Sequence, residues 1–191
     1  TSQSFLGQVT FNRNQLAVVS PLASGVLVEV LKSVGDEVKE GEVMAWIQSP
    51  VVAEAKMTLQ KEIAAAELAQ KTLLREQDLY NKKISPRKDL EEAEAAVAVS
   101  QSAIAGARQY LVNLGVSGDN VPSGKGASLL PVKAPFSSTV IGREAVQGTA
   151  VEIGTELFQV ADLSTMWMEL SIPESQISSM KEGTIVDARF D

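Results

Sequence analysis

Two distant segments of the sequence, residues 20–47 and 134–160, carry the same pattern of proline, alternating apolar residues and spaced glycines. Aligning Pro21 with Pro135 pairs Val26 with Val140 and, after one deletion, matches the runs Gly35-x-x-Val38-x-x-Gly41 and Gly148-x-x-Val151-x-x-Gly154. Alternation with period two is typical of half-buried strands, and glycine supplies the positive φ that tight turns require. Each copy is therefore predicted to be a strand, a turn and a strand. Because one copy buries too little apolar area to be stable alone, we expect the two copies to pack face to face.

Between the two copies the apolar period changes from two to seven. The first stripe consists of Val52, Leu59, Ala66, Leu73 and Tyr80. After a break at residues 81–86, one seam consists of Leu90, Val97, Ile104 and Leu111, and its companion of Ala93, Ser100, Ala107 and Leu114. A seven-residue apolar repeat is typical of coiled-coil helices. We expect two helices of about 30 residues in an antiparallel hairpin about 45 Å long, which projects from the body of the protein.

Chemical signals mark the ends of these helices. Ser49-Pro50 and Ser85-Pro86 each place a hydroxyl side chain before a proline, which predicts a serine N-cap followed by a proline at the first helical position. Gly115 follows the last seam residue and predicts the end of the second helix. Residues 115–128 are rich in Gly, Ser and Pro and are predicted to form a flexible loop.

Outside the repeat, further segments alternate like strands. Residues 5–11, 166–172 and 184–190 have this pattern, and residues 173–180 suggest one short helix between the last two. These segments do not continue either copy of the repeat. They are predicted to belong to a third, β-rich unit of which the chain holds a part.

Composition argues against several classes of function. The chain has 17 Lys and Arg against 24 Asp and Glu, a net charge of −7, which does not suit contact with nucleic-acid phosphates. It has neither cysteine nor histidine, so thiolate and imidazole metal sites are ruled out and an imidazole base is lacking. No phosphate loop or nucleophile elbow is found, and no apolar run approaches the roughly 18 residues of a membrane span. We therefore assign no catalytic residue and no cofactor.

The order of these elements resembles that of one protein family. A duplicated half-motif interrupted by an α-helical hairpin and flanked by barrel strands is similar to the periplasmic adaptors, or membrane fusion proteins, of bacterial tripartite efflux pumps. The Val-Gly-Asp-x-Val-x-x-Gly turn within residues 28–47 resembles the family's first lipoyl half, and Ala134-Pro135-Phe136 with residues 148–163 resembles the second. Residues 161–167, followed by Pro173-Glu174, are similar to the heavy-metal branch that works with resistance-nodulation-division pumps.

The resemblance implies a fold class that is mainly β with an inserted α-helical coiled-coil hairpin: a lipoyl-like (barrel-sandwich hybrid) domain plus part of a β-barrel domain. The implied division places the partial β-barrel domain at residues 1–14 and 162–191, the two halves of the lipoyl-like domain at 15–49 and 129–161, the hairpin at 50–114 and the loop at 115–128.

The resemblance also implies a coupling role rather than an enzymatic one. Such adaptors lie in the periplasm, associated with the inner membrane, commonly as hexamers. They link an inner-membrane efflux transporter to an outer-membrane channel and support export of metal cations or drugs. At the hairpin tip, family members often present an Arg, a Leu four residues on and a Ser beyond the turn to the channel. Arg75, Leu79 and Ser85 match this pattern, although a solvated charge, a turn-packing leucine and a helix cap explain the same residues without docking.

Other functions fit parts of the pattern. An adaptor of a type I secretion or ABC-type export system has a similar plan, though its hairpin is usually longer. A biotinyl or lipoyl carrier presents a lysine at a hairpin turn, and Glu54-Ala55-Lys56-Met57 is faintly similar to that turn. Lys56, however, falls inside the first predicted helix, where we expect a solvated lysine.

Metal binding is the remaining alternative. The soft-ligand candidates are Met44, Met57, Met166, Met168 and Met180. Methionine on an alternating apolar strand is usually a core residue, and this is the expectation for Met166 and Met168. Carboxylates at Asp36, Glu37, Glu40 and Glu42 could hold a hard cation, but acidic turn residues commonly face water. No metal site is assigned.

Overall fold

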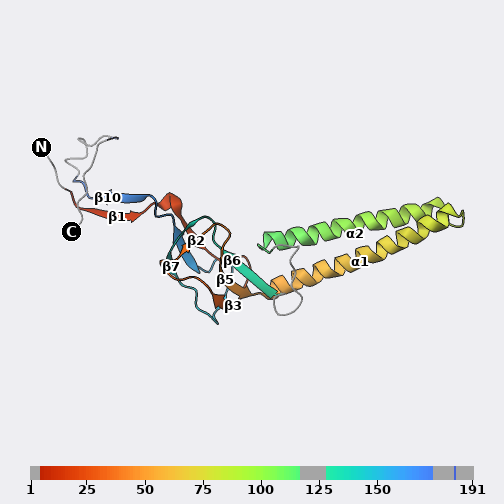
Figure 1. The fold of residues 1–191 in the computed structure, drawn as a ribbon, viewed down its shortest axis with the longest axis horizontal. Coiled ribbons are helices and arrows are strands. Elements are labelled where there is room, and N and C mark those ends of the chain that lie inside the picture. The colour runs from red at the N-terminus through yellow and green to blue at the C-terminus, as the bar shows by residue number, and fades with distance from the viewer. Residues whose placement is uncertain (1–4, 117–127, 174–182, 184–191) are drawn as a thin grey trace.

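A computed structural model describes residues 5–116, 128–173 and 183 of the chain (Figure 1). The β elements before the hairpin are β1 (Gly7–Phe11), the short 3-10 helix η1 (Arg13–Gln15), β2 (Leu16–Val19), β3 (Gly25–Val30), β4 (Glu37–Val38) and β5 (Val43–Gln48). The hairpin helices are α1 (Pro50–Asn81) and α2 (Arg87–Asn113). The strands after it are β6 (Leu129–Lys133), β7 (Ser138–Arg143), β8 (Ala150–Val151), β9 (Phe158–Ala161) and β10 (Met166–Leu170). The described part is elongated, with β1 and β10 at one end and the hairpin at the other.

Two four-stranded sheets make up the middle of the molecule, in the orders β2-β9-β7-β4 and β6-β5-β3-β8. Each sheet contains strands from both copies of the repeat. The short strand β4 of the first copy pairs with β7 of the second, and the short strand β8 of the second pairs with β3 of the first. The two copies therefore do pack together, as expected, and they do so by exchanging strands. Neither copy completes a four-stranded sheet with its own strands.

Hydrogen bonds at the turns show which residues of the two copies are equivalent. The Gly35 N–H donates to the Val140 carbonyl oxygen at 2.8 Å, and the Gly148 N–H donates to the Leu27 carbonyl oxygen at 2.7 Å. Both glycines have positive φ, 94° and 86°, as the turn prediction required. Leu27 and Val140 are thus the equivalent, buried residues. The sequence alignment of Val26 with Val140 is wrong by one residue, because the deletion lies before the strand and not after it.

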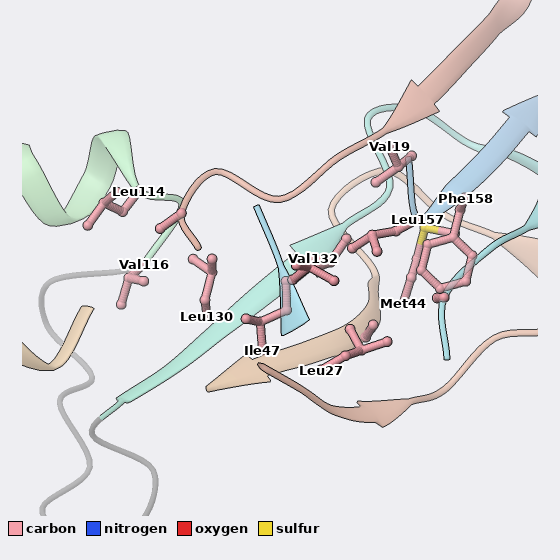
Figure 2. Close-up of a cluster of buried hydrophobic side chains, with 14 of the residues drawn as sticks. Val19, Leu27, Met44, Ile47, Leu114, Val116, Leu130, Val132, Leu157 and Phe158 are labelled. Atoms are coloured by element: carbon pink, nitrogen blue, oxygen red, sulfur yellow. The ribbon is translucent and has the colours of Figure 1, made fainter. Parts of the chain in front are cut away.

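The hydrophobic core continues from the sheets into the base of the hairpin. Figure 2 shows Leu114 and Val116, which follow the last residue of α2, lying close to Leu130 of β6 and Ile47 of β5. The same buried cluster includes Val52, Ala55 and Leu59 of α1 and Leu111 of α2. Packed apolar side chains therefore anchor the base of the hairpin to the two four-stranded sheets, which together form a β sandwich.

The seams of the hairpin follow the predicted heptads. The stripe residues of α1 and both seams of α2 are buried or half-buried, except that Tyr80 is exposed near the turn. The helices have 32 and 27 residues, which corresponds to about 48 and 40 Å at 1.5 Å per residue. After α2, the Gly115 N–H donates to the Val112 carbonyl oxygen at 2.8 Å and the Val116 N–H to the Leu111 carbonyl oxygen at 3.0 Å. This is a Schellman motif, and it confirms the predicted stop at Gly115.

The predicted helix starts are only partly right. Helix α1 begins at Pro50 with Ser49 as its N-cap residue, but the Ser49 side chain makes no capping hydrogen bond. Helix α2 begins at Arg87, so Pro86 is the N-cap residue and not the first helical residue. The cap predicted for Ser85 is wrong, because Ser85 lies one residue too early and its hydroxyl bonds to carboxylates instead.

Strands β1 and β10 form a separate two-stranded sheet. Val9 pairs with Met168 and Phe11 with Met166 in its register. Met166 and Met168 are exposed, so the expectation that they lie in a core is wrong for the described part of the chain, where no second layer covers this ribbon. The expected helix at residues 173–180, the strand at 184–190 and most of the loop at 115–128 lie outside the described residues.

The sandwich is expected to fold without its hairpin. The Ser49 N–H donates to the Ser128 carbonyl oxygen at 2.8 Å, and Gln48 pairs with Leu129, so the two ends of the insertion lie side by side. Replacing residues 50–127 with a short Gly-Ser linker should preserve dispersed amide NMR signals, at a lower melting temperature because the hairpin's share of the core is lost. The first copy alone, residues 15–49, should give random-coil signals. A folded single copy would contradict the need for strand exchange.

Two glycines should respond to alanine in opposite ways. A Cβ at Gly25 would clash with the Gln48 carbonyl and lie 2.7 Å from Ile47 Cγ2, whereas a Cβ at Gly106, in α2, would meet nothing within 4 Å. Gly25→Ala should lower the free energy of unfolding by about 1–3 kcal/mol. Gly106→Ala should raise it by up to about 1 kcal/mol, because alanine favours helix. Urea denaturation of both variants measures these changes, and equal effects would contradict the packing at Gly25.

Ser49, the N-cap residue of α1, is expected to respond unusually to replacement by alanine. Serine at an N-cap normally stabilises a helix, and its replacement by alanine costs about 0.5–2 kcal/mol. Ser49 Oγ is instead buried and lacks a hydrogen-bond partner in the described structure. Ser49→Ala should therefore leave stability unchanged or raise it by about 1 kcal/mol, because it removes an unsatisfied buried hydroxyl. Thermal denaturation checks this, and a loss typical of a cap would show that the hydroxyl is satisfied in solution.

Candidate docking surface at the hairpin tip

The connection between the two helices is held by backbone hydrogen bonds. The Ile84 N–H donates to the Leu79 carbonyl oxygen and the Lys83 N–H to the Tyr80 carbonyl oxygen, both at 2.9 Å, which is again a Schellman motif. Lys83 has a φ of 56°, in the left-handed region that glycine usually fills. A lysine there costs on the order of 1 kcal/mol. The turn is thus well defined, and the Ile84 side chain is exposed on it.

Arg75 lies on α1, about two helical turns before the helix ends. Its side chain is 66% exposed, and its Nε donates to Oε1 of Glu76 at 3.2 Å. The terminal nitrogens of the guanidinium make no hydrogen bond with the residues that the structure describes, so their N–H groups remain available as donors.

Ser85 lies on the other side of the turn and is half-buried. Its Oγ lies 3.1 Å from Oε2 of Glu76 and 3.3 Å from Oδ2 of Asp89. A hydroxyl carries a single hydrogen, so Ser85 donates to one of these carboxylates at a time. The bond to Glu76 ties Ser85, two residues before α2, to the last part of α1.

Leu79 is half-buried and lies four residues after Arg75, on the same face of α1. Of the three residues predicted to dock, Arg75 and Ser85 meet at one carboxylate, and Leu79 stands one helical turn from Arg75.

Glu76, which contacts both Arg75 and Ser85, was not among the residues predicted to dock. Its side chain is only 15% exposed, although glutamate is usually a surface residue. It continues a seven-residue series with Ala55, Glu62 and Ala69, all of them buried or half-buried. This series is a second seam of α1, beside the stripe predicted from the sequence. A carboxylate at a seam position close to the turn was the signal that could have identified it.

Three further ion pairs of the hairpin tip, residues 75–92, lie along the helices. Lys82 bonds to Asp78 at 2.6 Å, Arg87 to Glu91 at 2.8 Å and Lys88 to Glu92 at 3.5 Å. The hydrogen bond to Glu91 raises the pKa of Arg87 further. All of these pairs are exposed, so each contributes little to stability.

The structure also places the residues of the carrier and carboxylate alternatives. Lys56 lies within α1, as predicted, and not at a turn as a carrier lysine does. It is not solvated, however: only 4% of the residue is exposed, because it flanks the buried stripe between Val52 and Leu59, and burial lowers the pKa of its ammonium group. Among the described residues, no three Asp or Glu side chains are placed to hold a metal ion.

Acidic residues of the first turn serve local structure instead. Asp36 Oδ2 accepts from the Ser33 N–H at 2.8 Å, and Glu42 Oε2 accepts from the Lys39 N–H at 2.9 Å. Glu42 also pairs with Lys32 at 2.6 Å, and this bond is the main reason that the pKa of Glu42 is lowered. As for membranes, neither hairpin helix combines the length and the apolarity that a bilayer span requires.

Known proteins share this architecture. The chain is 28% identical over 179 residues to the cobalt-zinc-cadmium resistance protein CzcB of Cupriavidus metallidurans, over 94% of this chain and 34% of that protein. It is 29% identical to the nickel and cobalt resistance protein CnrB of the same organism, over 88% of this chain and 41% of that protein. The chain thus spans well under half the length of these curated relatives.

Solved structures agree with this match. The crystal structure of ZneB from Cupriavidus metallidurans superposes with a TM-score of 0.65 at 28% identity, over 92% of this chain and 72% of that chain. A MacA–MexA chimera with the Pseudomonas aeruginosa MexA α-hairpin has the same fold, with a TM-score of 0.62 at 22% identity, over 92% of this chain and 59% of that chain. Residues 15–162 match the family model described as the CzcB-like barrel-sandwich hybrid domain. The fold class predicted from the sequence is therefore confirmed, and the chain belongs to the CzcB-like barrel-sandwich hybrid family.

Proposed function

We propose that this chain is part of a periplasmic adaptor that links an inner-membrane efflux transporter of the resistance-nodulation-division type to an outer-membrane channel. The relatives named for resistance to cobalt, zinc, cadmium and nickel support metal cations as the exported substrate. The role is structural coupling, without catalysis or a cofactor.

The observation that carries this proposal is a long hairpin rooted in the core of a β sandwich. Val52 and Leu59 of α1 and Leu111 of α2 belong to the same buried cluster as the sheet residues. A force applied at the tip is therefore passed to the sandwich through close-packed side chains, which deform little. A coupler between two membranes needs this property, whereas an enzyme or a carrier domain does not.

The docking surface of the adaptor is proposed to comprise Arg75, Leu79 and Ser85. Arg75 offers N–H donors in a planar fork, which suits carbonyl or carboxylate oxygens on the channel. Leu79 adds an apolar side chain one helical turn nearer the end of α1. The exposure of Arg75 supports this assignment, since a solvated arginine is free to exchange water for a partner.

The remaining domain assignments are proposed on the same basis. Residues 15–49 and 129–161 form the lipoyl-like domain, 50–114 the hairpin and 115–128 the loop. Residues 1–14 and 162–191 belong to a β-barrel domain. The exposed apolar face of the β1–β10 ribbon supports this assignment, because further strands of a barrel would cover it. We further propose that the adaptor works in the periplasm, associated with the inner membrane, as a hexamer.

Arg75→Asp in the full-length protein should abolish efflux-dependent resistance to zinc, cobalt or cadmium in cells, because it replaces the donor fork with an acceptor. The free energy of unfolding should change by no more than about 0.5 kcal/mol, as is usual for exposed positions. Growth in metal and thermal melting of the purified protein measure the two effects. Lys61→Asp, an exposed change about 21 Å earlier on α1, is the matched control and should leave resistance intact. If Arg75→Asp keeps resistance at normal expression, Arg75 is an ordinary surface charge and not a docking residue.

A further inference from the structure

One carboxylate stands between the residues proposed to dock. Oε1 of Glu76 accepts from Nε of Arg75 at 3.2 Å, and Oε2 accepts from the Ser85 hydroxyl at 3.1 Å. The two donors come from opposite sides of the turn. Glu76 thus uses one oxygen for each, and it bridges the end of α1 and Ser85 in the turn before α2.

The burial of this carboxylate sets it apart from the other acids of the tip. The Glu76 side chain is 15% exposed, against 60% for Asp78 and 59% for Glu91. Hydrogen bonds to a partly desolvated carboxylate are stronger than exposed ones, because water competes less for its oxygens. Asp78 and Glu91 pair with cations on their own helices, so they do not connect the helices.

Fixing these donors changes what a partner meets. A free arginine side chain loses much rotamer freedom when it binds, and this loss weakens docking. Arg75 is held at Nε and its side chain is 66% exposed, so its terminal N–H groups stay accessible to a partner. The Ser85 hydrogen is committed to Glu76 or Asp89, so the serine oxygen can only accept from a partner.

We propose that Glu76 is a positioning residue of the docking surface, which fixes Arg75 as a donor and Ser85 as an acceptor at a set separation. The inference rests on the proposed docking function. It also states the chemistry of the partner: the channel presents an oxygen acceptor to Arg75 and a hydrogen-bond donor to Ser85, as the ends of two neighbouring helices or a loop with exposed backbone groups can do.

The test uses the full-length adaptor in its pump, with Glu76→Gln as the variant. An amide has one oxygen, so it can accept from Arg75 or from Ser85 but cannot serve both in the same way. We expect resistance to metal to fall toward that of Arg75→Ala, corresponding to docking weakened by about tenfold or more. Glu91→Gln, which breaks an exposed pair at the same tip, is the matched control and should be neutral.

A spectroscopic measurement separates positioning from simple support of the fold. In NMR spectra of the purified protein, the Arg75 Nε–H should exchange slowly with water and become fast in Glu76→Gln. In addition, Arg75→Ala should cost little further resistance once Glu76 is changed, because both act through one contact. Independent, additive losses or an unchanged Arg75 signal would overturn the proposal.

The outcomes also distinguish this inference from the proposed function. If Arg75→Ala loses resistance and Glu76→Gln keeps it, Glu76 is not a positioning residue and docking stands. If both variants keep resistance, docking through this surface is itself wrong. Should Glu76→Gln also melt earlier, Gly106→Ala can be added to stabilise the hairpin away from the tip. Resistance regained in that background would overturn the proposal, and resistance still lost would support it.

Discussion

Strand exchange between the two copies of the repeat is the constraint on which the rest of the structure depends. Each copy gives its short middle strand to the sheet of the other, through the pairs β3–β8 and β4–β7. Because the short strand of each copy finds its hydrogen-bond partners in the other copy, the two form a single cooperative unit despite the long insertion between them. The exchange also fixes where the insertion leaves and returns, since β5 and β6 are paired neighbours at that edge.

The hairpin follows from this arrangement. Paired exit strands place the first residues of α1 and the last residues of α2 over one end of the sandwich, where Val52 and Leu111 complete its core. Beyond the core, the helices are held only by their seam, and most of the remaining side chains face water. Stability is thus concentrated at the base, whereas the proposed docking surface lies at the tip. This separation allows the tip residues to vary for recognition without loss of the fold.

The tip departs from the pattern of the seam in two ways. Lys83 adopts a backbone conformation that favours glycine, and Glu76 places a carboxylate where an apolar residue would pack. Each feature costs stability locally. Such costs are common where a protein holds groups ready for a partner. They are compensated here by the hydrogen bonds of Glu76 and by the backbone bonds of the turn.

The sequence by itself determined the repeat, the strands of each copy, the heptad seams and the Gly115 stop, because these depend on local periodicity and on the φ preference of glycine. Only the tertiary structure decided which copy supplies each strand, and it moved the alignment so that Leu27 matches Val140. Strands that are far apart in the chain, such as those that pair Gly25 with Val151, leave no local pattern in the sequence when they pair. The burial of Lys56 and the contacts of Glu76 were likewise hidden, since both depend on side chains that come together only when the helices pack.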